Sequence, residues 1–147
     1  MALPYNDQDI TSADGQVVIT CDELYPNGIV LQQFSTDAMT SAENVQIAET
    51  RMGVDGYMAA GVTPAIVPVT VNLEANSPSR KPLDTIFGAQ QQNRRIYRCS
   101  MLIKIPATGE SYLFSRGCMQ AATSLPAAQR VLAPVTYTFH FERFEKV

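Results

Sequence analysis

Apolar and polar side chains alternate with a period of two in three separate stretches of this chain. The stretches are residues 65–73, 95–106 and 135–141. In the first of them Val67, Val69 and Val71 share one face, because successive side chains of a β-strand point to opposite sides. Strands buried on one face only are typical of antiparallel sheets. The sequence therefore predicts a mainly β fold, an antiparallel β-sandwich or small barrel.

Further strands are expected around these three. Residues 16–21 and 28–34 predict two strands joined by a Pro-Asn-Gly turn. Residues 44–52 alternate, with Val45 and Ile47 expected toward the core, and a loop is expected over 53–64. A tight turn at "ATGE" predicts a return strand, in which Gly117 indicates a bulge.

One segment changes to helical spacing. Leu83, Ile86 and Phe87 lie on one face of a helix that the sequence predicts after residue 79. Ser79 is expected to cap its N-terminus, and Pro82 is tolerated in the first turn. This single flanking helix is expected to cover one open end of the β core.

The length of 147 residues suits one domain, residues 1–147, in which residues 1–15 form a polar N-terminal arm. The N-terminus lacks the basic and apolar regions of a signal peptide, and no stretch is long enough for a membrane helix. We therefore expect a protein that is made and kept in a cytoplasm, without membrane partners.

Charge is low and slightly negative. Charged residues make up 17% of the chain and the formal net charge is −3, which disfavours a high-affinity nucleic-acid binder. Arg94, Arg95 and Arg98 cluster, but a solvated edge or ion pairs with neighbouring acids explain them better than phosphate binding does.

Residues for catalysis or metal binding are sparse. His140 is the only histidine, and Cys21, Cys99 and Cys118 are far apart, without the spacing of a zinc site or a disulfide framework. Phosphate-binding and nucleophile-elbow motifs are missing from the sequence. We expect buried free thiols, no cofactor, no metal and no enzymatic activity.

The stretch "MGVDGYMAAGVTP" is unusual because Asp55 is its only charge. Methionine and tyrosine are favoured in interfaces, and the glycines permit tight backbone geometry. This loop is either buried in an assembly or folded back over its own core.

Two motifs frame this loop. "NVQIAETRMGVDGYMAAGV" carries a Gly-x-Asp-Gly loop after a strand, and "AIVPVTVNLEANSPSRKPLDTIF" carries Leu-x-x-x-Ser-Pro-Ser-x-x-x-Leu before the helix. The motif residues are Gly53, Asp55, Gly56, Leu73, Ser77, Pro78, Ser79 and Leu83. Over residues 44–87 the layout resembles the tail tube proteins of contractile-tailed bacteriophages, which are related to the tubes of type VI secretion systems.

The resemblance implies a structural virion protein of the tail. Subunits would form hexameric rings that stack into the inner tail tube, a conduit for DNA ejection, and the sheath, tape measure and baseplate proteins would be partners. Strands of neighbouring copies would pair into one barrel, assembled in the host cytoplasm, and DNA would pass through without specific binding.

Two sets of residues follow from this resemblance. The expected inter-ring loop consists of Met52, Gly53, Val54, Asp55, Gly56, Tyr57 and Met58. The expected channel-lining residues are Gln46, Ala48, Thr50, Thr70 and Asn72.

Two other functions stay open. A baseplate or tail-terminator ring protein would have the same fold, and the two are distinguished by whether the protein forms long tubes or single rings. A small-ligand β-barrel would need an aromatic-lined pocket, whereas aromatic residues are only 8% of the chain and include no tryptophan.

Overall fold

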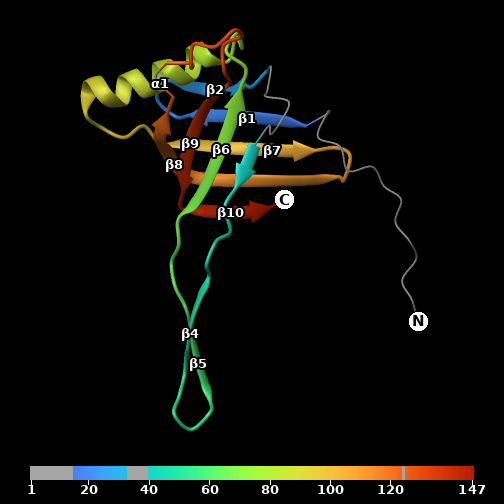
Figure 1. Cartoon of the computed structure of the whole chain (residues 1–147), viewed down its shortest axis with the longest axis vertical. Coiled ribbons are helices and arrows are strands. Elements are labelled where there is room, and N and C mark those ends of the chain that lie inside the picture. Colours follow the sequence, from blue (N-terminus) through green and yellow to red (C-terminus); the bar gives the residue numbers. More distant parts are fainter. Residues whose placement is uncertain (1–14, 33–39, 124) are drawn as a thin grey trace.

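The computed structural model of the chain describes residues 15–32, 40–123 and 125–147 (Figure 1). This part of the chain folds into ten strands and one helix. They are β1 (Gln16–Cys21), β2 (Tyr25–Val30), β3 (Thr40–Ala42), β4 (Ala48–Met52), β5 (Met58–Val62), β6 (Val67–Leu73), α1 (Arg80–Asn93), β7 (Cys99–Ile105), β8 (Glu110–Ala122), β9 (Val135–Phe141) and β10 (Arg143–Lys146). The expected N-terminal arm lies outside the described residues, except for Gly15.

The strands form one main sheet and one separate ribbon. The main sheet has the order β2-β1-β7-β8-β9-β6-β3, and β10 pairs with β8 beside this path. All of its pairings are antiparallel. Strands β4 and β5 pair only with each other in the described chain. The predicted antiparallel, mainly β fold with one helix is confirmed.

Strand β8 bends the main sheet into two layers. Its first half pairs with β7 and β10, and its second half pairs with β9. Between the halves, Met101 pairs with Phe114 while Cys99 pairs with Gly117, so β8 holds one extra residue there. Arg116 has a φ of 57° at this bulge. The bulge expected near Gly117 is confirmed, and Figure 1 shows β7, β8 and β10 running across β6 and β9.

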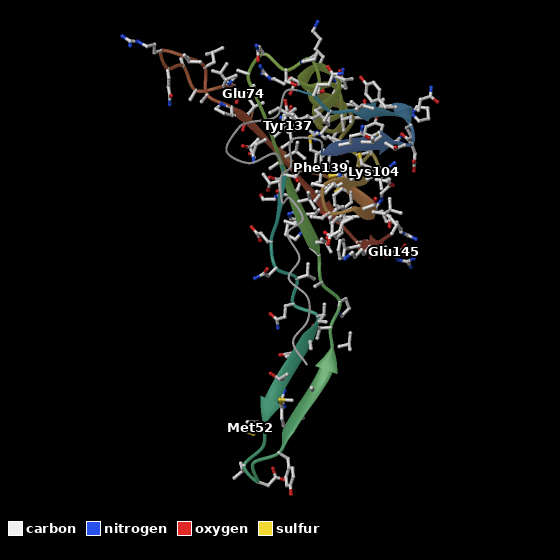
Figure 2. All side chains as sticks on the ribbon, turned by 90° about the vertical axis from the view of Figure 1, so that its right-hand side faces the viewer. Met52, Glu74, Lys104, Tyr137, Phe139 and Glu145 are labelled. Carbon is white, nitrogen blue, oxygen red and sulfur yellow. The ribbon has the colours of Figure 1, made fainter. Side chains whose placement is uncertain are left out.

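The core lies between these two layers. The alternation predicted for 65–73 and 135–141 is confirmed, because every second residue of β6 and β9 is buried. Tyr137, Phe139 and Phe141 are among the largest side chains with no or almost no exposure, and Figure 2 shows Tyr137 and Phe139 within the body.

Helix α1 covers one end of the core. Leu83 and Ile86 are fully buried beneath it. The Tyr137 hydroxyl donates to Asp84 Oδ1 at 2.7 Å, and Gln90 Nε2 donates to the Met119 carbonyl at 3.0 Å. The predicted covering helix is confirmed in position and in buried face.

The two serines before the helix act differently from the prediction. Ser79 occupies the N-cap position but makes no side-chain cap bond. Instead its Oγ accepts the Gln32 amide at 2.8 Å, and Ser77 Oγ donates to the Gln32 carbonyl at 2.5 Å. Both serines are buried, so they fix the start of α1 to the chain that follows β2.

Four local predictions are wrong. The turn before β2 lies at residues 22–24, and Pro-Asn-Gly sits inside β2, where Cys21 pairs with Tyr25 and Ile19 pairs with Ile29. Residues 40–42 form β3, although the small polar stretch from 35 to 44 predicts a loop, and residues 58–62 form β5 rather than loop. Strand β7 begins at residue 99, because the arginine-rich stretch ends α1 in a left-handed turn.

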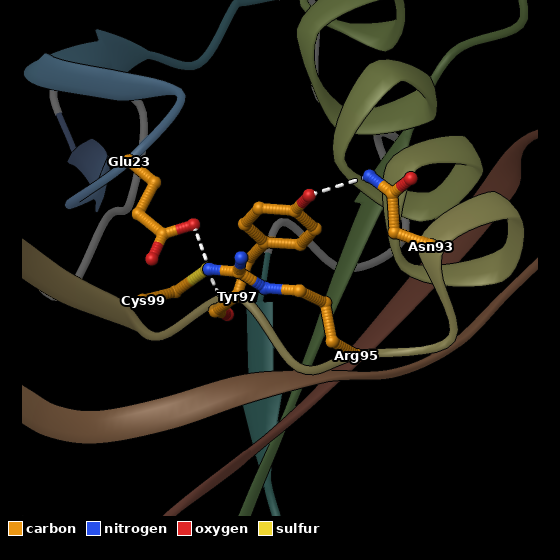
Figure 3. Close-up of polar contacts among 5 residues, drawn as sticks. All are labelled: Glu23, Asn93, Arg95, Tyr97 and Cys99. Carbon is orange, nitrogen blue, oxygen red and sulfur yellow. Dashed lines mark hydrogen bonds and ion pairs between the residues drawn. The ribbon is translucent and has the colours of Figure 1, made fainter.

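That stretch forms a joint between α1, β7 and the β1–β2 turn (Figure 3). Arg95 pairs with Glu23 of the turn, and its guanidinium lies 4.7 Å from the centre of the Tyr97 ring. Asn93 Nδ2 donates to the Tyr97 hydroxyl at 2.7 Å. An ion pair with an acid is one of the two expected explanations for this arginine cluster.

We expect any side chain at Gly117, in the bend of β8, to destabilise the fold. A Cβ built there would lie 2.2 Å from Phe141 Cδ1 and 2.6 Å from the His140 carbonyl oxygen. We expect Gly117→Ala to lower the free energy of unfolding by about 2 kcal/mol or more, since backbone must move. The matched control is Gly88→Ala in α1, where nothing lies within 4 Å and a gain of about 0.5–1 kcal/mol is expected. Denaturant unfolding measures both, and equal effects of the two substitutions would contradict the assignment.

Tyr137 should make stability depend on alkaline pH. Burial, followed by the hydrogen bond to Asp84, raises its pKa to about 12, whereas an unfolded tyrosine has a pKa of about 10. The protonated Tyr137 hydroxyl therefore contributes fully to the free energy of unfolding below pH 10, and this contribution is lost as the pH rises to about 12. We expect Tyr137→Phe to be less stable than the parent by about 1 kcal/mol at pH 7, and this deficit should shrink or reverse by pH 12. A deficit that does not change in this range would contradict the buried, protonated hydroxyl.

Candidate functional site

The β4–β5 hairpin projects far from the body of the molecule (Figures 1 and 2). Its ladder runs from the Ala48–Val62 pair to the Met52–Met58 pair. Every residue of both strands is exposed. Within the described residues, the hairpin therefore packs against no other element, and the backbone ladder between its two strands defines it.

The tip has a defined conformation. The Gly53 amide donates to the Tyr57 carbonyl at 2.8 Å, and the Gly56 amide donates to the Gly53 carbonyl at 3.0 Å. Asp55 Oδ1 accepts the Tyr57 amide at 3.2 Å. Gly56 has a φ of 87°, which favours glycine. The Gly-x-Asp-Gly motif thus closes the hairpin, and Asp55 acts within the turn.

Apolar side chains gather at this tip. Tyr57 is 77% exposed, Met52 67% and Met58 63%, and Val54 is fully exposed. Met52 and Met58 pair directly across the ladder. The alternative that the loop folds back over its own core is therefore wrong for the isolated chain. The expected inter-ring residues 52–58 are all brought together at the end of one projection.

The hairpin is an extension of the main sheet with a change of register. Ala42 pairs with Val69 in the body, and Ala48 pairs with Val62 in the hairpin, so one arm spans six positions and the other seven. Two backbone hydrogen bonds lie within this joint, from the Glu43 amide to the Pro68 carbonyl and from the Thr63 amide to the Ile47 carbonyl. The extra residue lies on the arm between β5 and β6.

The expected channel-lining residues fall into two groups. Thr70 and Asn72 lie on the half-buried outer face of β6, whereas Gln46, Ala48 and Thr50 lie on the projecting arm. The structure therefore does not bring the five onto one face of the body.

Strand β9 contributes residues that the sequence analysis missed. Thr138 pairs with Thr70, and Thr136 pairs with Asn72, with Thr136 Oγ1 donating to Asn72 Oδ1 at 3.0 Å. His140 pairs with Pro68 on the same face. The polar positions of "VTYTFHF" carried the signal, but only the register shows which partner each one has. At these six positions the face carries three threonines, an asparagine, a histidine and a proline, and no carboxylate, lysine or arginine.

In the described part of the chain, a groove of about 500 Å³ lies at the end of the core opposite α1. Its lining residues include Val45, Ile47, Phe114 and Phe144. Val45 packs partly against the core as expected. The same expectation is wrong for Ile47, which is 69% exposed because the chain is already leaving the sheet for the hairpin. Both ends of the projecting segment therefore expose apolar surface.

We next consider the side chains that could bind a metal ion or transfer a proton. Among the described residues, no three His, Cys, Asp or Glu side chains lie close enough together to hold a metal ion. His140 sits within the β8–β9–β6 ladder, where its partners are Cys118 and Pro68. In the part of the chain that the structure covers, the helix is too short and too polar to cross a bilayer.

Several solved structures share this fold. A chain in the cryo-EM structure of the anti-feeding prophage cap, the AFP tube terminating cap, matches with a TM-score of 0.64 and 15% identity, covering 100% of this chain and 94% of that one. A chain in the sheath/tube terminator of the PVC extracellular contractile injection system, in its extended state, matches with a TM-score of 0.61 and 14% identity, covering 99% of this chain and 99% of that one. A chain in the 6-fold symmetrised baseplate of the anti-feeding prophage matches with a TM-score of 0.61 and 12% identity, covering 100% of this chain and 97% of that one.

At such low identities the likeness concerns the fold. No curated protein sequence matches this chain. The family described as tail fiber protein gp32 matches residues 8–145, which is nearly the whole sequence. The chain therefore belongs to the tail fiber protein gp32 family, and its fold is that of tail-tube-like proteins.

Proposed function

We propose that this chain is a structural, non-catalytic subunit of a contractile tail that assembles with copies of itself into hexameric rings. The observation that carries the proposal is the β4–β5 hairpin, which holds an apolar tip away from the body. Apolar side chains exposed together mark a surface that a partner covers. The conformation of the tip is already fixed by hydrogen bonds within residues 53–57, so little ordering is needed on binding.

The hairpin is suited to a head-to-tail contact. A tip that contacts the body of the next copy, whose own tip contacts the copy after it, makes a heterologous contact rather than a two-fold one. Heterologous contacts generate closed rings or open stacks. The 6-fold symmetry stated for one of the similar structures supports a ring of six.

The neutral outer face of β6 and β9 is the best candidate for the channel wall. Thr70, Asn72, Thr136 and Thr138 offer hydroxyl and amide groups without net charge. A wall of this kind neither holds nor repels phosphate strongly, which suits passage of DNA without specific binding. Gln46, Ala48 and Thr50 would join this wall only where hairpins of neighbouring copies extend it.

A ring at the end of the tube is the second candidate. The similar structures are described as a terminating cap, a sheath/tube terminator and a baseplate, which supports a terminal ring as much as the tube itself. Partners would then be the tube, the sheath and the baseplate, with the tape measure and DNA inside. Electron microscopy of the purified protein separates the two, because a tube subunit forms long tubes and a terminator stops at single rings.

Tyr57→Asp and Met58→Asp test the role of the hairpin. Each buries a charge in the expected contact, so we expect loss of rings or tubes in negative-stain micrographs. The free energy of unfolding of the monomer should change by less than about 0.5 kcal/mol, because both side chains are exposed.

Gln129→Asp is the matched control, since it adds the same charge at an exposed residue of the β8–β9 connection. We expect normal assembly from this variant. Normal rings or tubes from Tyr57→Asp and Met58→Asp would refute the assignment of the hairpin.

A further inference from the structure

Two of the three cysteines face each other inside the body. Cys21 ends β1 and Cys99 begins β7, and the two residues are direct partners in the antiparallel ladder. Both side chains point into the core, with exposures of 0% and 1%. No residue of the proposed assembly surface is involved.

The type of pairing brings these thiols close together. The Asp22 amide donates to the Arg98 carbonyl at 3.3 Å, so the neighbouring Asp22–Arg98 pair is hydrogen-bonded. Because antiparallel pairs alternate, the Cys21–Cys99 pair is of the non-hydrogen-bonded type, in which Cα atoms lie about 4.5 Å apart. A disulfide accepts Cα separations of about 4.4–6.8 Å.

The thiols also interact with each other. Burial raises the pKa of the Cys99 thiol strongly, and the charge and hydrogen bond of Cys21 raise it further. The Cys99 thiol also donates to the Tyr97 carbonyl at 3.4 Å, in the joint drawn in Figure 3. Two thiols in mutual contact are held here by the fold, in a reduced state.

The third cysteine is oriented differently. Cys118 pairs with His140 and is half-buried. Cys99 pairs with Gly117, the residue before it. Since side chains alternate along β8, Cys118 points to the face opposite Cys99.

We propose that Cys21 and Cys99 form a modification site, at which a small-molecule disulfide such as oxidised glutathione converts the pair into a cross-strand disulfide while Cys118 stays outside it. One cysteine thiolate attacks a sulfur of oxidised glutathione, forms a mixed disulfide and releases one glutathione thiolate. The second cysteine thiolate attacks that mixed disulfide, forms the Cys21–Cys99 bond and releases the second glutathione. The two protons lost by the cysteines are taken up by the two glutathione thiolates, so two thiols are oxidised and one disulfide is reduced.

The location explains how a buried pair reacts. Both cysteines lie at strand ends, and in the described chain β1 is the second strand from the edge of the sheet, next to the edge strand β2. Strand ends and edges open locally at a lower free energy than the whole domain. The reaction is slow in the native state, because the thiolate forms only during such openings.

The bond would stabilise the subunit. It closes a long loop that contains α1 and the complete β4–β5 hairpin, and a disulfide across a long loop restricts the unfolded chain strongly. A particle that leaves the reducing cell for an oxidising medium would therefore gain resistance to unfolding.

Peptide mapping tests the pairing directly. Trypsin places the three cysteines in different peptides, residues 1–51, 99–104 and 117–130. After incubation of the native protein with oxidised glutathione, we expect a crosslink between 1–51 and 99–104 in a monomer, and free thiol in 117–130. A dominant crosslink that includes 117–130, or no crosslink at all, would overturn the proposal.

Oxidation of the unfolded chain and two cysteine variants serve as controls for this pairing. Oxidation in strong denaturant should favour the Cys99–Cys118 pair instead, because the shorter loop closes more readily. Cys118→Ala should keep the native crosslink and the accompanying rise in the denaturant midpoint, and Cys21→Ala should lose both. If Cys21→Ala does not fold, the peptide map of the parent protein still decides the pairing. A midpoint that falls on oxidation would overturn the stabilising role.

Discussion

The close approach of β8 to the end of β9 is the constraint on which the rest of the structure depends. One strand belongs to both layers, so the layers can face each other only if β8 changes direction within the bulge at residues 114–117. The main chain of His140 and the ring of Phe141 fill the space that a side chain at Gly117 would need. Glu142, the residue between β9 and β10, forms an ion pair with Arg116, in which 3.0 Å separate Glu142 Oε2 from Arg116 Nε. The ion pair is exposed and contributes little energy, so packing at the glycine determines the bend.

The molecule keeps its core apart from its projecting hairpin. The core is continuous from β1 to β9 and is covered at one end by α1, whereas every residue of β4 and β5 is exposed in the described structure. Residues of the tip can therefore change without affecting the fold, and residues of the core can change without affecting the tip. The chain belongs to the tail fiber protein gp32 family, and it shares its fold with chains of a terminating cap, a sheath/tube terminator and a baseplate.

The sequence predicted the elements whose signal is local. Strong alternation located β6, β7 and β9, and a change to helical spacing located α1. The prediction failed where pairing between segments determines the structure. "MAAGV" forms β5 because it pairs with β4, although alanine and glycine are poor strand residues. Pro26 is accommodated in β2 because β2 lies at an edge. The partners of Thr70 and Cys99 depend on register between distant strands, which no spacing in the sequence reveals.

The extra residue between β5 and β6 has a mechanical consequence. Regular pairing stops at Ala42–Val69 and resumes at Ala48–Val62 with a different offset. Two backbone hydrogen bonds join the arms over this stretch, fewer than regular antiparallel pairing of that length supplies, so we expect bending to cost least at this joint. In the assembly proposed above, the same tip can therefore be aimed at neighbours that lie at different angles while the body stays unchanged.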